Sequence, residues 1–348
     1  MAGATPQLIK ELREMTGAGM LDCKNALNET DGDLEKAVQA LREAGLGKAA
    51  KKAGNIAAEG VIAVKVNADN TVATMLELNA QTDFVAKNEN FLKLTQEILS
   101  HAQANNIVDA EALASSTISG TSFSDFLNGK IATIGENLVA RKLVTVTGTV
   151  VNAYVHTNGR VGVLLAATCD DAAKEKAVAL LKSLAMHASA MKPTVISYTD
   201  LDPAFVESEN RAIVAEITAD NDELKRLGKT LKNIPDFVSR SQLTESAIAN
   251  AKAAFEAELK EQGKPEKIWA NIIPGKIERY ITDNTQLDGR FALLSQAYVM
   301  NDKITVEQAI AEVDASIKIT EYIRFELGEG IEKKEEDFAA EVAKQMGK

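Results

Sequence analysis

A short polar run around one phenylalanine, TDFVAKN at residues 82–88, holds the pair of side chains with the clearest potential to act on another molecule. The run follows a strand-like segment at 72–78 and precedes a helical stretch at 91–104. A large aromatic side chain next to a carboxylate, in a polar connection, is what a protein needs to push a wedge and a charge into another protein. The alternative is a helix start, with Asp83 as the N-cap and Phe84 packed back onto the core. On these residues alone the helix start is favoured, because local caps are far commoner than wedges between proteins.

Length and composition limit the class of protein that carries this motif. The 348 residues are enough for two or three domains, each with its own core. Two cysteines, Cys23 and Cys169, are too few for a disulfide framework and lack metal-ligand spacing, so we expect a cytoplasmic chain with both as small core residues. A net charge of −11 argues against direct nucleic-acid binding. The sequence shows neither a signal-peptide core nor an apolar run of membrane-spanning length, so we expect no membrane partner.

The residues that usually carry catalysis or hold metals are not arranged for either role. Gly228-Lys229-Thr230 matches the last three residues of a phosphate-binding loop motif. Glu223, however, stands where the first glycine of such a loop must be. The histidines, His101, His156 and His187, lack the cysteine or carboxylate spacing of a metal site or a nucleophile-base pair. We expect His156 to be exposed in a hairpin turn and His187 to be a hydrogen-bonded core residue. The sequence thus predicts no enzyme, no cofactor and no metal.

Residues 5–45 show apolar patterns of helical spacing separated by turns, which predicts a small three-helix bundle. Gly17 and Gly19 separate the first two helices, and Ala44-Gly45 is a suitable glycine C-cap for the third. The Lys-, Ala- and Gly-rich stretch at 47–55 is typical of a linker, with a helical linker as the alternative to an irregular one. We therefore expect an N-terminal helical module with its linker at 1–55.

Beyond this module the sequence contains an internal duplication of a hairpin followed by a helix. The first copy comprises strands at 61–66 and 71–78 and the helix from Phe91; the second comprises strands at 149–155 and 160–166 and a helix at 172–191. Antiparallel sheets covered on one face by helices, formed twice, give an α+β core with two similar halves. We expect core half one at 56–146 and core half two at 147–330.

The duplication provides an internal comparison for the TDFVAKN motif. Where the first copy has Thr82-Asp83-Phe84-Val85, the second passes from strand to helix through Thr168-Cys169-Asp170-Asp171, with no aromatic residue. A core role for Phe84 would have a counterpart at the related position, so the scaffold does not require this phenylalanine. The comparison therefore favours a functional wedge over a simple helix start.

Two further helical segments lie outside the duplicated pattern. A helical arm is inserted in core half two at about 204–286, with apolar residues at helical spacing between prolines and glycines. Packing of the arm helices on one another is the expected use of this apolar face, and a homodimer through the arm is the alternative. The last segment, 331–348, carries an apolar stripe of Phe338, Val342 and Met346 that faces either its own core or a partner's groove.

The chain also contains three motifs in separate regions: LREMTGAGMLDCK at 12–24, TDFVAKN at 82–88 and IRFELGEGIEK at 323–333. Together these motifs closely resemble the bacterial translation elongation factor Ts family, and the likeness covers nearly the whole chain in order. The arm looks longer than the usual coiled-coil hairpin of that family. The family's use of the hairpin is therefore the part of the resemblance that applies least directly to this chain.

The resemblance implies a guanine nucleotide exchange factor for elongation factor Tu, a GTPase that leaves each decoding cycle with GDP and a magnesium ion. Such a factor meets the GDP-bound partner, promotes GDP release and stabilises the nucleotide-free GTPase, without binding nucleotide itself. In the family the wedge motif enters the GTPase domain beside the magnesium site, which here assigns magnesium dislocation to Thr82, Asp83, Phe84 and Val85. Phe84 would part packed side chains, and Asp83 would disturb the groups that hold the ion.

The family's other partner contacts also transfer position by position. The N-terminal module, which resembles a ubiquitin-associated fold, the core and the terminal helix each contribute some of them. The partner-binding positions are Arg13, Met20 and Leu21 in the module, Ile134 and His156 in the core, and Phe338 and Val342 in the terminal helix. Leu21 stands where methionine is commoner, which is a conservative change.

Two other functions compete with nucleotide exchange. A protein-protein adaptor without exchange activity would use the helical module and the arm, but it leaves the TDFV sequence unexplained. An enzyme acting on small molecules in the cleft between the core halves would need a catalytic constellation that the sequence lacks.

Overall fold

The computed structural model describes residues 3–156 and 158–332 of the chain. Phe338 and Val342, expected in a terminal helix, lie outside these residues. The chain forms two units: unit 1 contains the chain up to Leu164 and again from Ile323, and unit 2 contains Leu165–Tyr322. No helix within the described residues is both long enough and apolar enough to span a membrane.

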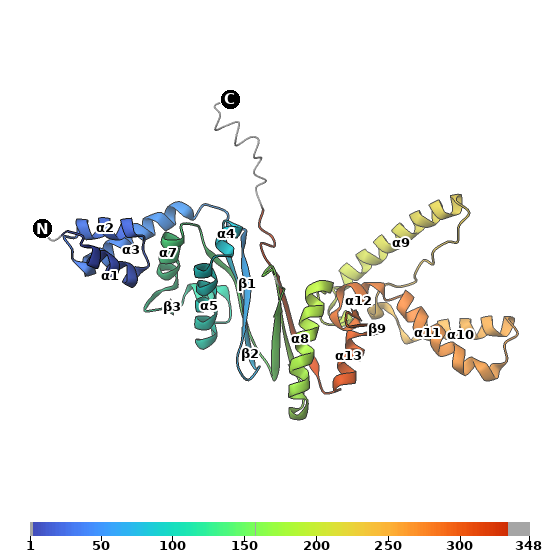
Figure 1. Cartoon of the computed structure of the whole chain (residues 1–348). Coiled ribbons are helices and arrows are strands. Elements are labelled where there is room, and N and C mark those ends of the chain that lie inside the picture. The colour runs from blue at the N-terminus through green and yellow to red at the C-terminus, as the bar shows by residue number, and fades with distance from the viewer. Residues whose placement is uncertain (1–2, 157, 333–348) are drawn as a thin grey trace. The chain divides into compact units, whose positions relative to one another are not determined.

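Unit 1 begins with three helices, α1 (Pro6–Thr16), α2 (Met20–Glu29) and α3 (Leu34–Lys52) (Figure 1). The side chain of Thr5 caps α1, and that of Asp33 caps α3. Gly17 ends α1 in the left-handed conformation with φ 66°, which glycine adopts without strain. The helices enclose a small core of Leu12, Cys23, Ala26, Leu27 and Ala37. The expectation that Cys23 is a small core residue is therefore confirmed.

The third helix is longer than the sequence predicts. It continues through Gly45 to Lys52, so the expected cap at Ala44-Gly45 is wrong, and most of the expected linker at 47–55 is helical. Gly45 is buried against α7 (Phe123–Ile134), where an added Cβ would lie 3.3 Å from the Cβ of Ala132. The glycine thus permits the close approach of two helices, and the Ala- and Lys-rich residues after it have high helix propensity.

The first sheet has the strand order β1-β2-β5, with β1 (Glu59–Val66), β2 (Val72–Ala80) and β5 (Val139–Thr147) in antiparallel pairs. α5 (Glu89–Ala104) packs on the sheet through buried residues that include Phe91 and Ile98. The chain then passes through α6 (Ala110–Ala114), the short hairpin of β3 (Thr117–Ile118) and β4 (Thr121–Ser122), and α7 before it enters β5. The end of α7 therefore leads directly into the sheet.

The second sheet has the order β10-β7-β6, with β6 (Val150–Val155), β7 (Val161–Thr168) and β10 (Lys318–Glu326). After β7, a 3-10 turn at Asp171–Ala173 leads into α8 (Lys174–Met191). The division between the units falls inside β7 and β10. Sheets with antiparallel pairs and separate covering helices make this an α+β protein, as the sequence predicts.

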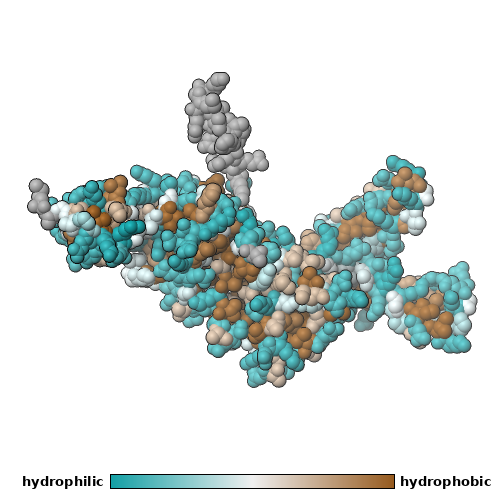
Figure 2. All heavy atoms as spheres, in the orientation of Figure 1, coloured by the Kyte–Doolittle hydropathy of each residue, from teal (hydrophilic) through white to brown (hydrophobic). Residues whose placement is uncertain are grey.

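Three long helices of unit 2 occupy the region expected to form the arm: α9 (Pro203–Arg226), α10 (Glu245–Glu261) and α11 (Trp269–Asp283). α10 and α11 lie side by side (Figure 1), with the rings of Phe255 and Tyr280 edge to face at 6.4 Å between centroids. Figure 2 shows hydrophobic residues at the surface of both α9 and the α10–α11 pair. The arm helices therefore bury only part of their apolar faces within the chain.

His187 of α8 is fully buried and hydrogen-bonded, which confirms the sequence prediction for this residue. The backbone N–H of Val299, between β8 (Ala297–Tyr298) and β9 (Asn301–Thr305), donates to Nδ1 at 3.2 Å. The proton therefore lies on Nε2, which donates to Oε1 of Gln296 at 3.0 Å. Burial lowers the pKa of His187, and the hydrogen bond with Gln296 opposes this effect only in part.

A buried carboxylate joins the first sheet to the turn that follows β10. Glu77 in β2 is fully buried, and its two oxygens accept hydrogen bonds from Arg141 of β5 at 3.0 and 2.9 Å. The pairing register of β2 with β5 shifts beside Glu77, so Arg141 is the extra residue of a β-bulge. The N–H of Gly328 donates to Glu77 at 2.9 Å, and Arg141 donates to the carbonyl of Glu329 at 2.8 Å. One carboxylate thus fixes three segments of unit 1.

Replacement of Arg141 by methionine leaves Glu77 as a buried charge without its cationic partner. We expect the free energy of unfolding to fall by about 3 kcal/mol. Arg160→Met is the matched control, because it removes only the more exposed pair of Arg160 with Glu59 and should cost less than about 1 kcal/mol. Urea unfolding followed by circular dichroism measures both losses, and equal losses would contradict the importance of the buried pair.

The lowered pKa of His187 makes the stability of unit 2 depend on pH. The unfolded chain binds the proton at the ordinary pKa of 6.5, whereas the folded chain binds it only at lower pH. Stability from neutral His187 is therefore complete above 6.5 and is lost as the pH falls below that value. We expect the native chain to lose more stability than His187→Gln between about pH 7.5 and 5.5. Fluorescence of Trp269, the single tryptophan, reports unfolding of the same unit, and equal losses would refute the prediction.

Candidate functional site

The TDFVAKN segment forms a short helix, α4 (Asp83–Ala86), between β2 and α5. Its N-cap is Thr82, whose Oγ1 accepts a hydrogen bond from the N–H of Val85 at 3.3 Å. The side chain of Val85 packs against the core of the first sheet, and Ala86 is buried. Phe84 points away from that core, with 82% of its surface exposed. The alternative from the sequence, with Asp83 as the cap and Phe84 packed inward, is therefore wrong.

Phe84 is unusual even among the exposed apolar residues of this chain. Single exposed apolar side chains are normal on protein surfaces. Among the described residues, however, no other large apolar side chain is as exposed as Phe84, the next being Leu21 at 69%. The core-facing position at this turn is taken by Val85, so the fold leaves Phe84 free for contact with another molecule.

Asp83 lies next to Phe84 with its carboxylate on the surface. Nζ of Lys87, one turn later, is 2.6 Å from Oδ2 of Asp83. This hydrogen bond holds the pKa of Asp83 below its ordinary value, so the carboxylate is ionised at neutral pH. Both side chains are largely in solvent, and such an exposed pair contributes little to stability. The segment thus presents an aromatic ring and a negative charge together.

Glu136, which is not among the site residues expected from the sequence, binds the residues at the start of this segment. Glu136 follows α7 in the loop that leads into β5. Its carboxylate accepts hydrogen bonds from the backbone N–H groups of Gln81 and Thr82 and from the hydroxyl of Thr82. The only sequence signal for Glu136 is its place in KIATIGEN at 130–137, two residues after the expected contact Ile134.

His156 and Asp83 line the same hollow of about 660 Å³. Its walls come from β1, α4, α5 and the residues around the β6–β7 turn, and it also contains Arg160 and Lys87. His156 is exposed, as the sequence predicts, and its Nδ1 lies 3.3 Å from the hydroxyl of Tyr154. The structure therefore brings together two expected site residues that are far apart in the sequence.

The other expected contacts do not line this hollow. Arg13 of α1 and Met20 and Leu21 of α2 are exposed on the N-terminal module. Ile134 is half-buried at the end of α7, where it packs against the core of the first sheet. The described site residues thus form two separate exposed groups, with Ile134 partly involved in the core.

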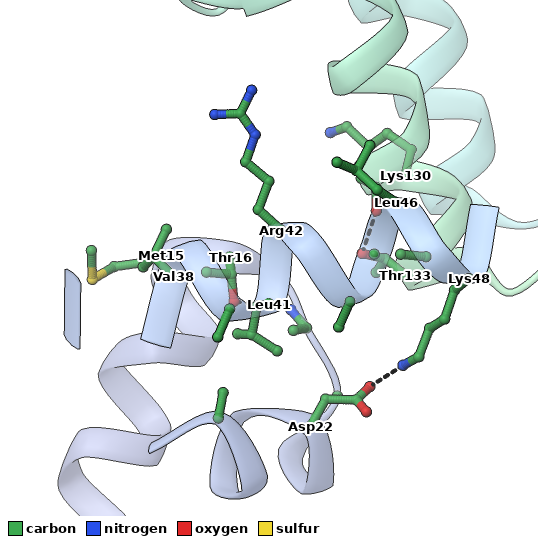
Figure 3. A pocket seen from close by; sticks show the side chains of 18 of the residues that line it. Met15, Thr16, Asp22, Val38, Leu41, Arg42, Leu46, Lys48, Lys130 and Thr133 are labelled. Carbon is green, nitrogen blue, oxygen red and sulfur yellow. Dashed lines mark hydrogen bonds and ion pairs between the residues drawn. The ribbon is translucent and has the colours of Figure 1, made fainter. Parts of the chain in front are cut away.

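A second hollow, of about 630 Å³, lies between the module and α7 (Figure 3). In this hollow Lys48 pairs with Asp22 at 2.9 Å, as Figure 3 shows. Arg42 of α3 pairs with Asp125 of α7 at 2.7 Å. Across the part of the chain that the structure describes, no group of three or more His, Cys, Asp or Glu side chains could hold a metal ion. We interpret this hollow as the joint between the module and α7, because the Arg42–Asp125 pair and the packing of Gly45 against Ala132 both connect α3 to α7.

Comparisons with known proteins find close relatives along the entire chain. The family described as "Elongation factor TS" matches residues 81–233 and 232–329. The elongation factor Ts of Aliarcobacter butzleri (strain RM4018) is 79% identical over 348 residues, 100% of each chain. Those of Campylobacter hominis and Helicobacter pylori (strain G27) are 53% and 52% identical, over 99% of this chain and 99% and 100% of the relatives. The family match includes the TDFVAKN segment, and the relatives also cover the N-terminal module.

The pairing of Asp83 with Lys87 can be tested directly. In Lys87→Met we expect the pKa of Asp83 to rise toward its ordinary value of 3.8, because the hydrogen bond that lowers it is lost. Lys93→Met is the control, since Lys93 pairs with Glu89 on α5. Carbon NMR of the Asp83 carboxyl group during a pH titration measures the change. An unaltered titration in Lys87→Met would show that Lys87 does not hold the carboxylate in solution.

Proposed function

Because the chain belongs to the elongation factor Ts family, we propose that it is a guanine nucleotide exchange factor for elongation factor Tu in translation elongation. It promotes GDP release by disturbing the magnesium site of the GTPase, and it stabilises the nucleotide-free state. It carries out no covalent chemistry and needs no cofactor, and it acts in the cytoplasm.

The exposure of Phe84 is the observation that carries this proposal. The 82% exposed ring extends from a segment whose neighbouring residues, Val85 and Ala86, face the core. On contact with the GTPase, the ring of Phe84 becomes buried and its apolar surface is removed from water. Asp83 brings an ionised carboxylate to the same place. Phe84 is the wedge between packed side chains, and Asp83 acts on the surroundings of the ion.

A small displacement near the ion is sufficient for nucleotide release. Magnesium requires near-ideal octahedral geometry and bridges protein groups to the phosphates, so a shift of its surroundings weakens the nucleotide strongly. Each ~1.4 kcal/mol of destabilisation lowers affinity about tenfold. Linkage makes the effect reciprocal: if the factor weakens GDP binding, GDP weakens binding of the factor by the same ratio. The factor therefore binds the empty GTPase best and is displaced by the next nucleotide.

The remaining contacts distribute binding over a wide surface. Arg13, Met20 and Leu21 bind the GTPase from the ubiquitin-associated-like module, and their exposure supports this role. His156 and Ile134 contact the partner from the core, and Phe338 and Val342 do so from the terminal segment. Binding by these groups is separate from the wedge, so affinity and nucleotide release can be changed independently.

Phe84→Ala separates exchange from simple adaptor binding. We expect the native chain to accelerate release of a fluorescent GDP analogue from elongation factor Tu, and the variant at saturation to be slower by roughly tenfold or more. Val108→Ala, which truncates another exposed apolar residue of unit 1, should behave like the native chain. No acceleration by the saturating native chain would favour the adaptor. Equal acceleration by Phe84→Ala would remove the wedge from the mechanism but leave exchange intact.

A further inference from the structure

The helix that carries Phe84 is too short to set its own orientation. α4 has four residues, far below the length at which a helix is stable in isolation. The backbone hydrogen bonds that span α4, from Ala86 to Thr82 and from Lys87 to Asp83, are 3.3 and 3.2 Å long, at the weak end of the usual range, and only the bond from Asn88 to Val85 at its end is shorter, at 2.9 Å. The direction in which Phe84 points must therefore be fixed by contacts outside α4.

The carboxylate of Glu136 provides such contacts at the point where the chain enters α4. One oxygen accepts from the N–H groups of Gln81 at 3.1 Å and Thr82 at 3.0 Å, and the other accepts from the Thr82 hydroxyl at 2.6 Å. Hydrogen bonds to an ionised carboxylate are roughly twice as strong as neutral ones. The same Thr82 hydroxyl accepts from the N–H of Val85, so the carboxylate, the cap and the first turn of α4 form one connected chain.

Glu136 is itself held firmly. Gly135, with φ 87°, ends α7 in the left-handed conformation, and the chain turns there so that Glu136 reaches the end of β2. In the next residue, Nδ2 of Asn137 donates to the carbonyl of Asn55 at 2.8 Å, and Nδ2 of Asn55 donates to Oε1 of Gln81 at 3.2 Å. The loop after α7 therefore holds Gln81 both directly and through Asn55.

We propose that Glu136 is a positioning residue for nucleotide exchange, which fixes Gln81 and Thr82 so that Phe84 and Asp83 are presented to the GTPase in one orientation before binding. This inference rests on the proposed function. A segment ordered in advance loses less conformational entropy when it enters the partner, so more of the binding energy is available to displace the ion's surroundings. Ile134 is the last residue of α7, two positions before Glu136, so an expected partner contact lies close to Glu136 in the sequence.

Glu136→Gln tests this role because the amide keeps the side-chain length but loses the charge and replaces one acceptor by a donor. We expect the maximal rate of GDP-analogue release to fall about tenfold, while the concentration of factor at half-maximal rate changes little. Glu97→Gln is the matched control: Glu97 pairs with Lys130 at 3.3 Å on the surface of the same unit, and its loss should leave both parameters native. A native maximal rate in Glu136→Gln would overturn the inference.

A double variant shows whether Glu136 acts through the wedge. In a chain that already carries Phe84→Ala, we expect Glu136→Gln to cause little additional loss, because residues that act as one unit are not additive. A further loss of the same factor as in the native background would show that Glu136 acts elsewhere. Glu136→Asp keeps the charge but is too short to reach all of its donors, so it should fall between native and Glu136→Gln.

Hydrogen exchange of the free chain tests the positioning without the partner. In Glu136→Gln we expect faster exchange of the amides of Gln81 and Thr82, with unchanged protection of α5 as the sign that the fold is intact. Unchanged exchange at these two amides would overturn the positioning role, whatever the activity. If the native chain did not accelerate GDP release from the GTPase, but amide exchange were fast in Glu136→Gln, the proposed function would be refuted. The hydrogen bonds of Glu136 to Gln81 and Thr82 would still be established.

Discussion

The charge of Glu77 inside the first sheet is the constraint on which unit 1 depends. A buried carboxylate is tolerated only when it is paired and hydrogen-bonded. Arg141 reaches it because a bulge in β5 adds one residue at that point, and the N–H of Gly328 and the side-chain amide of Asn79 also donate to it. The register of two strands and the position of the chain after β10 are therefore set together. Since β2 runs on into Gln81 and Thr82, this constraint also gives the exposed motif a rigid base.

A second carboxylate, that of Glu136, holds the segment that follows β2 at the surface. Glu136 binds the two residues between β2 and α4, and Val85 anchors the other side of α4 to the core. Between these anchors the fold exposes Phe84, whose apolar surface is not buried by the described residues of the chain. The pair of Asp83 with Lys87 is exposed and weak, so the carboxylate can exchange Lys87 for another partner at little cost. The backbone of the site is thus held from two sides, whereas its charged side chains are exposed.

The sequence was most informative where the pattern is local. Hairpins, helices, the α+β class and the burial of His187 all follow from the spacing of apolar residues within short segments, and each agrees with the structure. It was misleading at Gly45, because a glycine near the end of a helical pattern resembles a cap unless the opposing Ala132 on α7 is known. It was silent on Glu136, whose hydrogen-bond partners are 54 and 55 residues away. The local sequence around a carboxylate does not say which distant N–H groups it will meet.

By itself, the sequence determined that this chain belongs to the elongation factor Ts family, and it predicted Thr82, Asp83, Phe84 and Val85 as site residues, because both rest on motifs of consecutive residues. Only the tertiary structure decided the direction of each side chain in that motif. Which face of a four-residue helix meets the core depends on the sheet beneath it and on the carboxylate beside it, and both are formed by residues remote in the chain. The residue types of the TDFVAKN segment are therefore set by the local sequence, whereas the direction in which each side chain points is set by the packing of the whole fold.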